Sequence, residues 1–340
     1  MKLIIDAMGG DNAPLEIVKG ALSGQKRWGV DVTLTGDTTA ILQALEACGE
    51  KTLPQGMEIV HTTETVEMCD DPATVFRRKK DTSMGVGLTM LRDGRADAMV
   101  SAGSTGALLT GATLIVKRIR GIRRAAMAPV IPTTTGQAVL IDCGANAECT
   151  PEYLVQFAYL GSYYAHRVLG VERPRVGLLN IGTEDSKGTD LQKETLRWLR
   201  EAHTAGHLNF IGNIEAKEAI KGGCDVIVCD GFSGNVLLKT MEGVGSFAGS
   251  ALKAMFKKNL LTKLAALCVM PGLNAFKAKL DPNKVGGTAF IGISRPVIKA
   301  PGSSNAEAIE NAMGQAVQVA RSGIIRDIEE NVALMKVERE

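Results

Sequence analysis

Six apolar segments of this chain run directly into turns rich in glycine, serine, asparagine and aspartate, and each turn is followed by a helical pattern. These segments cover residues 3–6, 97–100, 137–142, 175–181, 225–230 and 297–300. Near-continuous apolar strands that alternate with helices predict a Rossmann-like α/β fold, with a mainly parallel sheet covered by helices on both faces. Because turns after parallel strands emerge at the carboxyl edge, we expect all six turns to meet along one edge.

The first turn gives the strongest indication of what this edge binds. Gly9, Gly10, Asp11 and Asn12 follow the apolar run 3–5, and Pro14 is placed to open a helix. A turn alone needs one glycine for a positive φ, so two glycines beside polar residues indicate a backbone that approaches some other group closely. Free N–H groups at helix N-termini suit anions, phosphate above all. The alternative is that each glycine only makes a tight turn.

The familiar nucleotide fingerprints are absent from the sequence. No G-x-x-x-x-G-K-[ST] segment occurs, and residues 103–108 have the wrong spacing for a dinucleotide-binding G-x-G-x-x-G. A site for free phosphate or a small phosphate compound therefore fits these turns better than a nucleotide site, and no cofactor is expected. Lys and Arg number 39 against 37 Asp and Glu, and aromatic residues make up 4%, so nucleic acid is not an expected partner.

Two other kinds of catalytic site have little support. Ser233, within residues 231–235, could be an acyl-enzyme nucleophile, but no base is evident for it. His203 and His207 have the i, i+4 spacing of a zinc pair, yet Gly206 between them favours the end of a helix. We expect no metal.

The most polar turn, residues 182–190, contains Lys187 among acids, hydroxyls and two glycines. Lys187 is a candidate cation for a phosphate or a developing oxyanion, and the alternative is a solvated loop. Asn235 is a second candidate catalytic residue because its amide could donate to a substrate oxygen; as an alternative, it could cap the helix that follows. The candidate substrate-binding residues lie in four of the six turns and are Gly9, Gly10, Asp11, Asn12, Ser104, Thr105, Gly106, Asn146, Ser233 and Gly234.

Residues 243–280 contain six lysines and no acid, and 260–273 are nearly all apolar. Pro271 and Gly272 should interrupt a helix, so we expect a long helix and a basic, apolar helical hairpin over 236–280, within a single α/β domain covering 1–340. An apolar tip flanked by lysines could rest on anionic lipid. The alternative is a helix buried in a homodimer interface. The candidate membrane-contact residues are Leu260, Leu261, Leu264, Leu267 and Met270.

Neither a secretory leader nor an apolar run long enough to span a membrane is evident. The expected location is the cytoplasm, with any membrane contact superficial.

Five motifs together resemble one bacterial enzyme family. Residues 1–14, 100–109, 141–146, 180–189 and 230–235 are similar, in order and nearly without gaps, to the fatty acyl-acyl carrier protein:phosphate acyltransferases of the PlsX type. The resemblance implies transfer of a long acyl chain from acyl carrier protein to inorganic phosphate. The acyl phosphate formed feeds glycerol-3-phosphate acylation, the start of phospholipid synthesis.

The resemblance also implies a homodimer with the fold of isocitrate and isopropylmalate dehydrogenases and phosphotransacetylases. It implies peripheral association with the inner face of the cell membrane, near the downstream glycerol-3-phosphate acyltransferase. Two alternatives are a non-catalytic membrane scaffold for lipid-synthesis enzymes and a decarboxylating dehydrogenase of the same fold. Basic residues that could dock an acidic carrier lie at 77–80 and 117–124.

Overall fold

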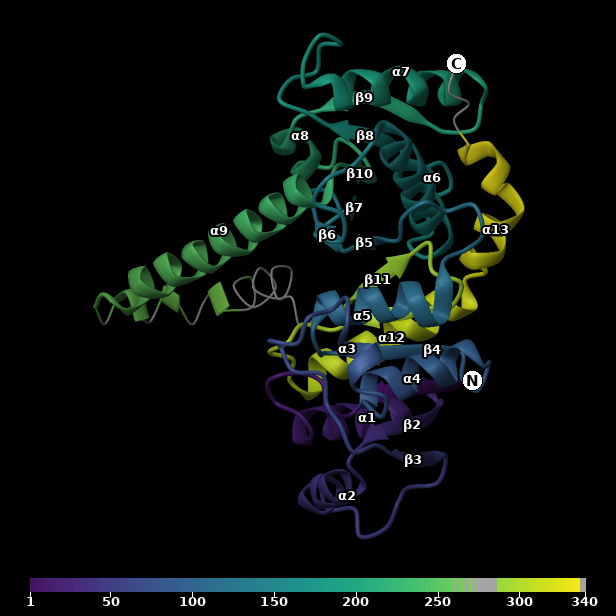
Figure 1. The fold of residues 1–340 in the computed structure, drawn as a ribbon. Coiled ribbons are helices and arrows are strands. Elements are labelled where there is room, and N and C mark those ends of the chain that lie inside the picture. The colour runs from purple at the N-terminus through teal and green to yellow at the C-terminus, as the bar shows by residue number, and fades with distance from the viewer. Residues whose placement is uncertain (260, 264, 267–268, 271, 273–285, 337–340) are drawn as a thin grey trace.

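The computed structural model describes residues 1–336 except 260, 264, 267–268, 271 and 273–285. Its strands form a seven-stranded sheet in the order β3-β2-β1-β4-β12-β11-β5 and a five-stranded sheet in the order β6-β7-β10-β8-β9 (Figure 1). The first sheet contains β1 (Lys2–Asp6), β2 (Asp31–Gly36), β3 (Met57–His61), β4 (Ala98–Ser101), β5 (Ala126–Ala128), β11 (Thr288–Ile291) and β12 (Val297–Lys299). The second contains β6 (Val130–Pro132), β7 (Gln137–Ile141), β8 (Val176–Leu179), β9 (Phe210–Ile214) and β10 (Val226–Val228).

Helices follow most of the strands. In the first half of the chain they are α1 (Leu15–Trp28), α2 (Thr38–Ala47), α3 (Val75–Arg78), α4 (Ser83–Arg92) and α5 (Thr105–Gly111), the last continued by a π-helical segment, η1 (Ala112–Lys117). In the second half they are α6 (Pro151–Arg167), α7 (Asp190–Thr204), α8 (Ala216–Ile220), α9 (Gly231–Lys257), α12 (Ala306–Arg321), α13 (Ile324–Asn331) and a 3₁₀ segment, η2 (Val332–Met335).

The apolar run of β1 shows why the strands are hydrophobic throughout. Leu3 and Ile5 are buried in one core cluster with residues of α1 and α12, whereas Ile4 is buried in another with residues of α4. Successive side chains of a strand point to opposite faces, so a strand covered on both faces needs apolar residues at every position. The predicted α/β class, with helices on both faces of mainly parallel sheets, is confirmed; among the described strands β6 and β11 pair antiparallel with their neighbours.

All six predicted strands are present, but the prediction that their turns share one edge of one sheet is wrong. The turns after β1, β4 and β12 lie at the carboxyl edge of the seven-stranded sheet, and those after β7, β8 and β10 lie at that of the five-stranded sheet. The cause is the segment 126–132, which leaves the first sheet as β5 and enters the second as β6. We call these two sets of turns the first edge and the second edge.

Strand directions place the two edges toward each other. β5 runs in the same direction as β12 and β4, because β11 is antiparallel to both β5 and β12. The chain therefore leaves the first sheet at its carboxyl edge. β7 then runs back antiparallel to β6, and the Cys143 N–H donates to the carbonyl of Met127 in β5 at 3.0 Å. The second edge thus begins beside the end of the first sheet.

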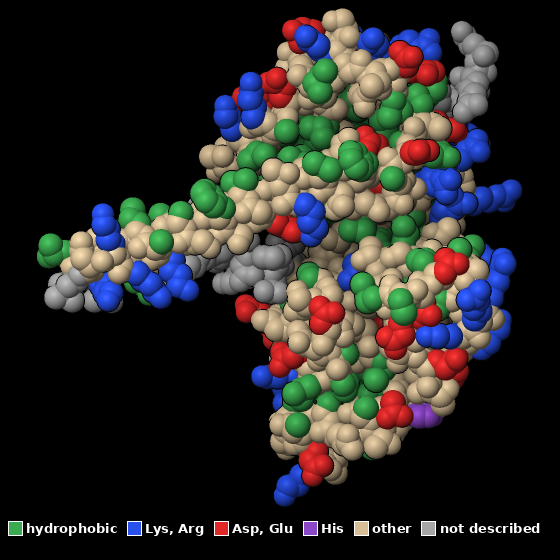
Figure 2. All heavy atoms as spheres, turned by 60° about the vertical axis from the view of Figure 1, so that its left-hand side comes forward, with side chains coloured by type: hydrophobic (Ala, Val, Ile, Leu, Met, Phe, Trp, Pro, Cys, Tyr) green, Lys and Arg blue, Asp and Glu red, His purple; other side chains and the backbone are tan. Residues whose placement is uncertain are grey.

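Helix α9 projects from the body of the molecule as an arm (Figure 1). It begins at Gly231, five residues before the predicted start at 236, because Asp230 caps it. Along the arm, hydrophobic and basic side chains gather at its outer part (Figure 2). Of the predicted membrane-contact residues, Leu261 and Met270 are exposed, at 77% and 42%. Leu260, Leu264 and Leu267 lie outside the described residues, as does most of the predicted hairpin.

Glycines of α1 lie against α12 where a larger side chain would not fit. A methyl group at Gly20 would lie 2.6 Å from both the Ala306 carbonyl oxygen and Ile309 Cβ. We expect Gly20→Ala to lower the free energy of unfolding by up to about 2 kcal/mol, because overpacking costs about 1–3 kcal/mol and the gain in helix propensity offsets only ~1 kcal/mol of it. Denaturant unfolding measures this change.

Gly243→Ala is the matched control. Gly243 also lies within a helix, α9, but nothing is within 4 Å of the position its methyl group would occupy. This substitution should leave the stability unchanged or raise it by up to about 1 kcal/mol. Equal effects of the two substitutions would contradict the packing argument.

Candidate active site

At the first edge, the carboxylate of Asp6 joins three parts of the chain. Asp6 ends β1 with 1% exposure. It accepts hydrogen bonds from the Ser83 hydroxyl at 2.7 Å and from the Ser101 hydroxyl at 2.6 Å. Burial raises the pKa of Asp6, and these hydroxyl donors oppose that shift. The Ser101 hydroxyl in turn accepts from the Gly103 N–H at 3.1 Å, so one buried carboxylate fixes the positions of the turns after β1 and β4.

The two adjacent glycines have different requirements. A methyl group at Gly9 would lie 2.6 Å from Asp6 Oδ2 and 2.7 Å from the Gly103 nitrogen, so only glycine fits. Gly10 has a φ of +104°, which favours glycine for conformational reasons. Within the described part of the chain, no hydrogen bond is found for the N–H of Gly9 or Gly10. The predicted close approach of this backbone to a neighbour is confirmed, and the neighbour is the turn after β4.

The turn after β12 completes the first edge. The Asp11 N–H donates to the Gly302 carbonyl at 2.8 Å. The Asn12 side-chain amide donates to the carbonyls of Ser303 and Ser304, at 3.2 and 3.1 Å. The predicted residues of the 101–107 turn lie beside these: Ser104 is the N-cap of α5, Thr105 opens that helix, and Gly106 lies against Pro72. The three turns predicted from sequence are therefore held together by hydrogen bonds of both backbone and side-chain groups.

Lys299, the last residue of β12, is a charged residue at this edge that sequence reasoning missed. It is 8% exposed, and its ammonium donates to the carbonyls of Ala102, at 3.2 Å, and Ala300. Burial lowers its pKa to about 8, whereas Asp11 and Asp6 oppose that shift. A lysine inside an apolar run, immediately before a glycine-rich turn, was the available signal.

At the second edge, Asp142 has a role like that of Asp6. It is completely buried, and its carboxylate accepts from the N–H groups of Met127, Cys143, Ala145 and Asn146 and from the Asn146 amide, over 2.6–3.4 Å. Burial raises its pKa against the opposing effect of these donors. The Asn146 carbonyl accepts from the Gly231 N–H at 2.8 Å, which ties the turn after β7 to the start of α9.

The start of α9 corrects one interpretation of Asn235. Asp230 is the N-cap, accepting from the Ser233 N–H and the Ser233 hydroxyl at 2.8 Å each. Asn235 lies in the helix, so its alternative role as an N-cap is wrong. Its side chain is exposed and close to Gly144, where a methyl group would lie 3.8 Å from Asn235 Cγ. Gly234 is required by close packing, since a methyl group there would lie 2.0 Å from the Asp142 carbonyl oxygen.

The turn that carries Lys187 is held by amide side chains. Asn180 donates to the Lys187 carbonyl at 3.2 Å, and Asn213 donates to the Glu184 carbonyl at 3.0 Å. The stem of Lys187 lies across Gly182, and its side chain is exposed. Because β8 is the neighbour of β10, this turn lies at the same edge as the turn that carries Asn235.

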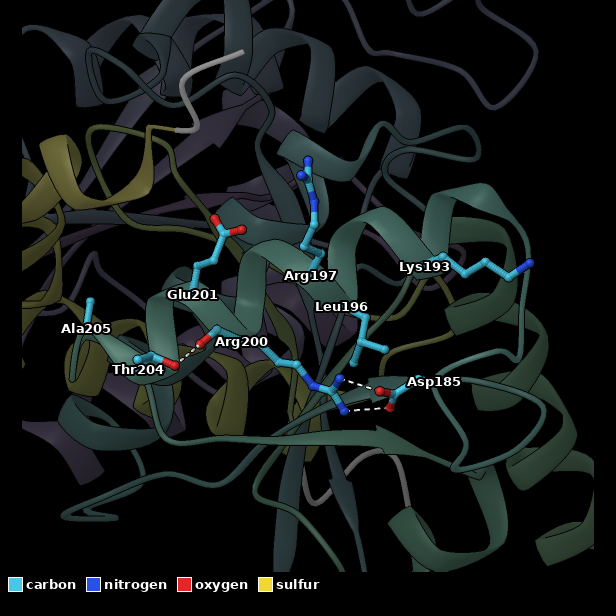
Figure 3. A pocket seen from close by; sticks show the side chains of 8 residues that line it. All are labelled: Asp185, Lys193, Leu196, Arg197, Arg200, Glu201, Thr204 and Ala205. Atoms are coloured by element: carbon cyan, nitrogen blue, oxygen red, sulfur yellow. Dashed lines mark hydrogen bonds and ion pairs between the residues drawn. The ribbon is translucent and has the colours of Figure 1, made fainter. Parts of the chain in front are cut away.

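A hollow of about 700 Å³ lies beside α7, next to this turn. Figure 3 shows the guanidinium of Arg200 directed at the carboxylate of Asp185, an ion pair in which both side chains are more than half exposed. Lys187 and the glycines of the turn are not among the residues that line the hollow. We therefore place the candidate site at the two edges and not in this hollow.

The described residues contain no group of three or more His, Cys, Asp and Glu side chains that could hold a metal ion. His203 is in the last turn of α7, and Gly206 follows the helix with a φ of +77°, which confirms the predicted helix end. Within the described residues, none of the helices is both long enough and apolar enough to cross a membrane.

Comparison with known proteins identifies relatives over nearly the whole chain. A family model described as "Fatty acid synthesis protein" matches residues 1–327. The chain is 46% identical over 333 residues to a phosphate acyltransferase from Alkaliphilus oremlandii, covering 98% of each chain. It is 42% identical over 335 residues to a phosphate acyltransferase from Thermoanaerobacterium thermosaccharolyticum, again covering 98% of each.

Solved structures of low sequence identity share the fold. A phosphotransacetylase from Streptococcus pyogenes superposes with a TM-score of 0.65 at 18% identity, covering 94% of each chain. A 4-hydroxythreonine-4-phosphate dehydrogenase from Klebsiella pneumoniae gives 0.55 at 13% identity, covering 94% of this chain and 99% of that one. The expected likeness to phosphotransacetylases is confirmed as a likeness of fold.

The five donors around Asp142 generate a prediction about stability. In Asp142→Asn, one carboxylate oxygen becomes an NH₂ group that faces other donors. We expect a loss of about 2–4 kcal/mol in the free energy of unfolding, because buried polar groups lose their partners. Asp185→Asn makes the same chemical change in an exposed ion pair and should cost less than about 1 kcal/mol. Denaturant unfolding at pH 7 compares them, and similar losses would refute a structural role for Asp142.

Proposed function

The chain belongs to the fatty acid synthesis protein family, and we propose that it transfers a long-chain acyl group from acyl carrier protein to inorganic phosphate, for phospholipid synthesis. The observation that carries this proposal is the first edge, where two adjacent glycine N–H groups without partners in the described chain lie at the carboxyl end of a parallel sheet. Oriented N–H groups in turns of this kind form anion-binding concavities.

The reaction that fits the two edges needs no nucleophile from the enzyme. A phosphate oxygen attacks the carbonyl carbon of the thioester, and a tetrahedral oxyanion forms. When it collapses, the carbon–sulfur bond breaks, the carrier leaves as a thiol after its sulfur takes up the proton that the phosphate loses, and acyl phosphate remains. The enzyme contributes by holding the two reactants together and by stabilising the oxyanion.

We assign phosphate to the first edge and the thioester to the second. Gly9, Gly10, Ser104 and Thr105 would bind the anion through backbone N–H groups. Lys187 and Asn235 would stabilise the oxyanion, because their side chains are exposed and make no hydrogen bond within the described chain. Ser233 is already hydrogen-bonded to Asp230, which supports a structural role for its hydroxyl and not a nucleophilic one.

The proposed activity is tested by incubating the protein with long-chain acyl-acyl carrier protein and inorganic phosphate, without nicotinamide or metal. Acyl phosphate is trapped with hydroxylamine as the hydroxamate. Product that requires both substrates and the protein is the expected result. Absence of product, with lipid-synthesis enzymes still bound, would support the scaffold alternative instead.

Substitution of the two candidate catalytic residues distinguishes an effect on turnover from an effect on stability. We expect Lys187→Ala and Asn235→Ala each to lower kcat by about 10²–10³, the effect of losing one oxyanion donor. The free energy of unfolding should change by no more than about 0.5 kcal/mol, because both side chains are on the surface. Lys193→Ala, at an exposed position on α7, is the control and should retain full turnover. Parallel losses of kcat and stability would show that the loop is only structural.

The outer part of α9 supports a proposal about membrane contact. Met255 and Leu261 are exposed beside Lys253, Lys257, Lys258 and Lys263, which are also exposed. We propose that this end of the arm rests on anionic lipid at the inner face of the cell membrane, near the downstream acyltransferase. The inner part of α9, where Val244 and Phe247 are exposed, would pair with a second copy of the chain.

An acidic carrier protein would dock on basic surface near the substrate edges. The 77–80 cluster is partly neutralised, since Lys79 pairs with Asp70 at 2.7 Å. Arg123 pairs with Glu152 at 3.1 Å in the second cluster. Both remain proposals for the docking surface.

Membrane contact through the arm predicts a specific mutational effect. Leu261→Glu should weaken binding to phosphatidylglycerol vesicles at least about tenfold, because burying one leucine contributes about 1.5–3 kcal/mol. Co-sedimentation measures the binding, and added salt should weaken it further. Leu42→Glu, at an exposed position on α2, is the control. Equal binding to vesicles of neutral phosphatidylcholine would contradict the lipid proposal.

A further inference from the structure

We propose that Lys299 is the cation that binds inorganic phosphate at the first edge, a proposal that rests on the function proposed above. Lysines are rarely buried, and when they are, their charge is normally paired or used. Lys299 is neither on the surface nor in an ion pair within the described chain. Its place among the glycine-rich turns is the reason to assign it a ligand.

The strand register places Lys299 directly at the phosphate turns. Lys299 of β12 is opposite Ser101 of β4, the residue whose hydroxyl donates to Asp6. The ammonium donates to the carbonyl of Ala102, and a methyl group at Gly10 would lie 3.6 Å from that same oxygen. One carbonyl therefore separates the buried cation from the glycine whose N–H has no partner in the described chain.

The hydrogen bonds of this ammonium leave part of its capacity unused. A lysine ammonium has three N–H donors, and two of these go to the carbonyls of Ala102 and Ala300. The described residues supply no acceptor for the third. Carbonyl groups solvate a cation but do not neutralise it, so the site retains a positive charge beside the turn amides. A phosphate dianion at this edge would supply the missing acceptor and a negative charge in direct contact with the ammonium.

The charged groups that face Lys299 support a binding role over a purely structural one. They are Asp11, from the turn after β1, and Asp6, from β1 itself. Neither forms an ion pair with it, and Asp6 is committed to the hydroxyls of Ser83 and Ser101. Lys187 lies in the turn after β8, at the second edge. The two lysines would therefore have separate roles: Lys299 would bind the phosphate and Lys187 would contact the thioester.

The pKa of Lys299 predicts how phosphate affinity should depend on pH. The pKa of Lys299 is about 8, below the ordinary 10.5, because burial disfavours the charge. Below that pKa the ligand-free site carries the ammonium, and above it the amine is neutral. Phosphate is already mostly dianionic there, so its affinity should fall about tenfold for each pH unit above about 8.

Calorimetric titration of the full-length protein with inorganic phosphate, without acyl donor, tests this proposal. We expect Lys299→Met to raise the Kd for phosphate at least tenfold and to remove the pH dependence. Lys299→Gln keeps an N–H donor for the two carbonyls but loses the charge, and it should raise the Kd similarly. The control is Lys19→Met, the same substitution at an exposed position on α1, a helix that packs on the seven-stranded sheet.

Folding is checked by thermal unfolding, and Lys299→Gln serves if Lys299→Met does not fold. Phosphate binding by either variant with the wild-type Kd, or a wild-type Kd that is constant from pH 7 to about 10, would overturn the assignment. So would wild-type protein that binds no phosphate. If phosphate binding requires Lys299 but no acyl phosphate is made from acyl-acyl carrier protein, this inference stands and the proposed function fails.

Discussion

The buried carboxylate of Asp6 is the interaction on which the first edge depends. It is the acceptor for hydroxyl groups from two other elements, α4 and β4, and its Oδ2 occupies the space that a side chain at Gly9 would need. A carboxylate placed so deeply is costly unless it is hydrogen-bonded, which is why Ser83 and Ser101 are required with it. The turns after β1 and β4 lie close together because Asp6 is hydrogen-bonded to both parts of the chain. Position 9 must be glycine because no space is left for a side chain between them.

At the second edge, too, buried or capping aspartates accept hydrogen bonds that hold the turns, but the donors differ. Asp142 follows β7 and accepts mainly backbone N–H groups, while Asp230 follows β10 and caps α9. In all three cases an aspartate at the carboxyl end of a strand holds the turn that comes next. The glycines then permit neighbouring turns to touch. Rigid turns of this kind keep N–H groups oriented before a ligand arrives, which is what electrostatic stabilisation of a reacting anion requires.

The sequence allowed the six strands, their turns and the helical end at Gly206 to be predicted, because each has a strong local signal. It did not reveal that the turns belong to two sheets. That division depends on 126–132, two three-residue strands around Pro129 whose partners are distant in the chain. Asn235 was interpreted as a possible cap because the sequence does not show that Asp230 starts the helix. Lys299 was missed because its sequence signal, a lysine in an apolar run before a glycine-rich turn, does not show whether the side chain reaches solvent. Its burial and its hydrogen bond to the Ala102 carbonyl show that it does not.

The unbroken course of α9 has a mechanical consequence. The helix has 27 residues and begins at Gly231, within the second edge, so at 1.5 Å per residue its far end is about 40 Å away. Asn235 and Met255 thus lie on the same continuous helix. A surface bound by the outer end would therefore set the distance and tilt of the proposed thioester site relative to that surface. A change in what the outer end binds would therefore rotate the helix that carries the Asn235 side chain.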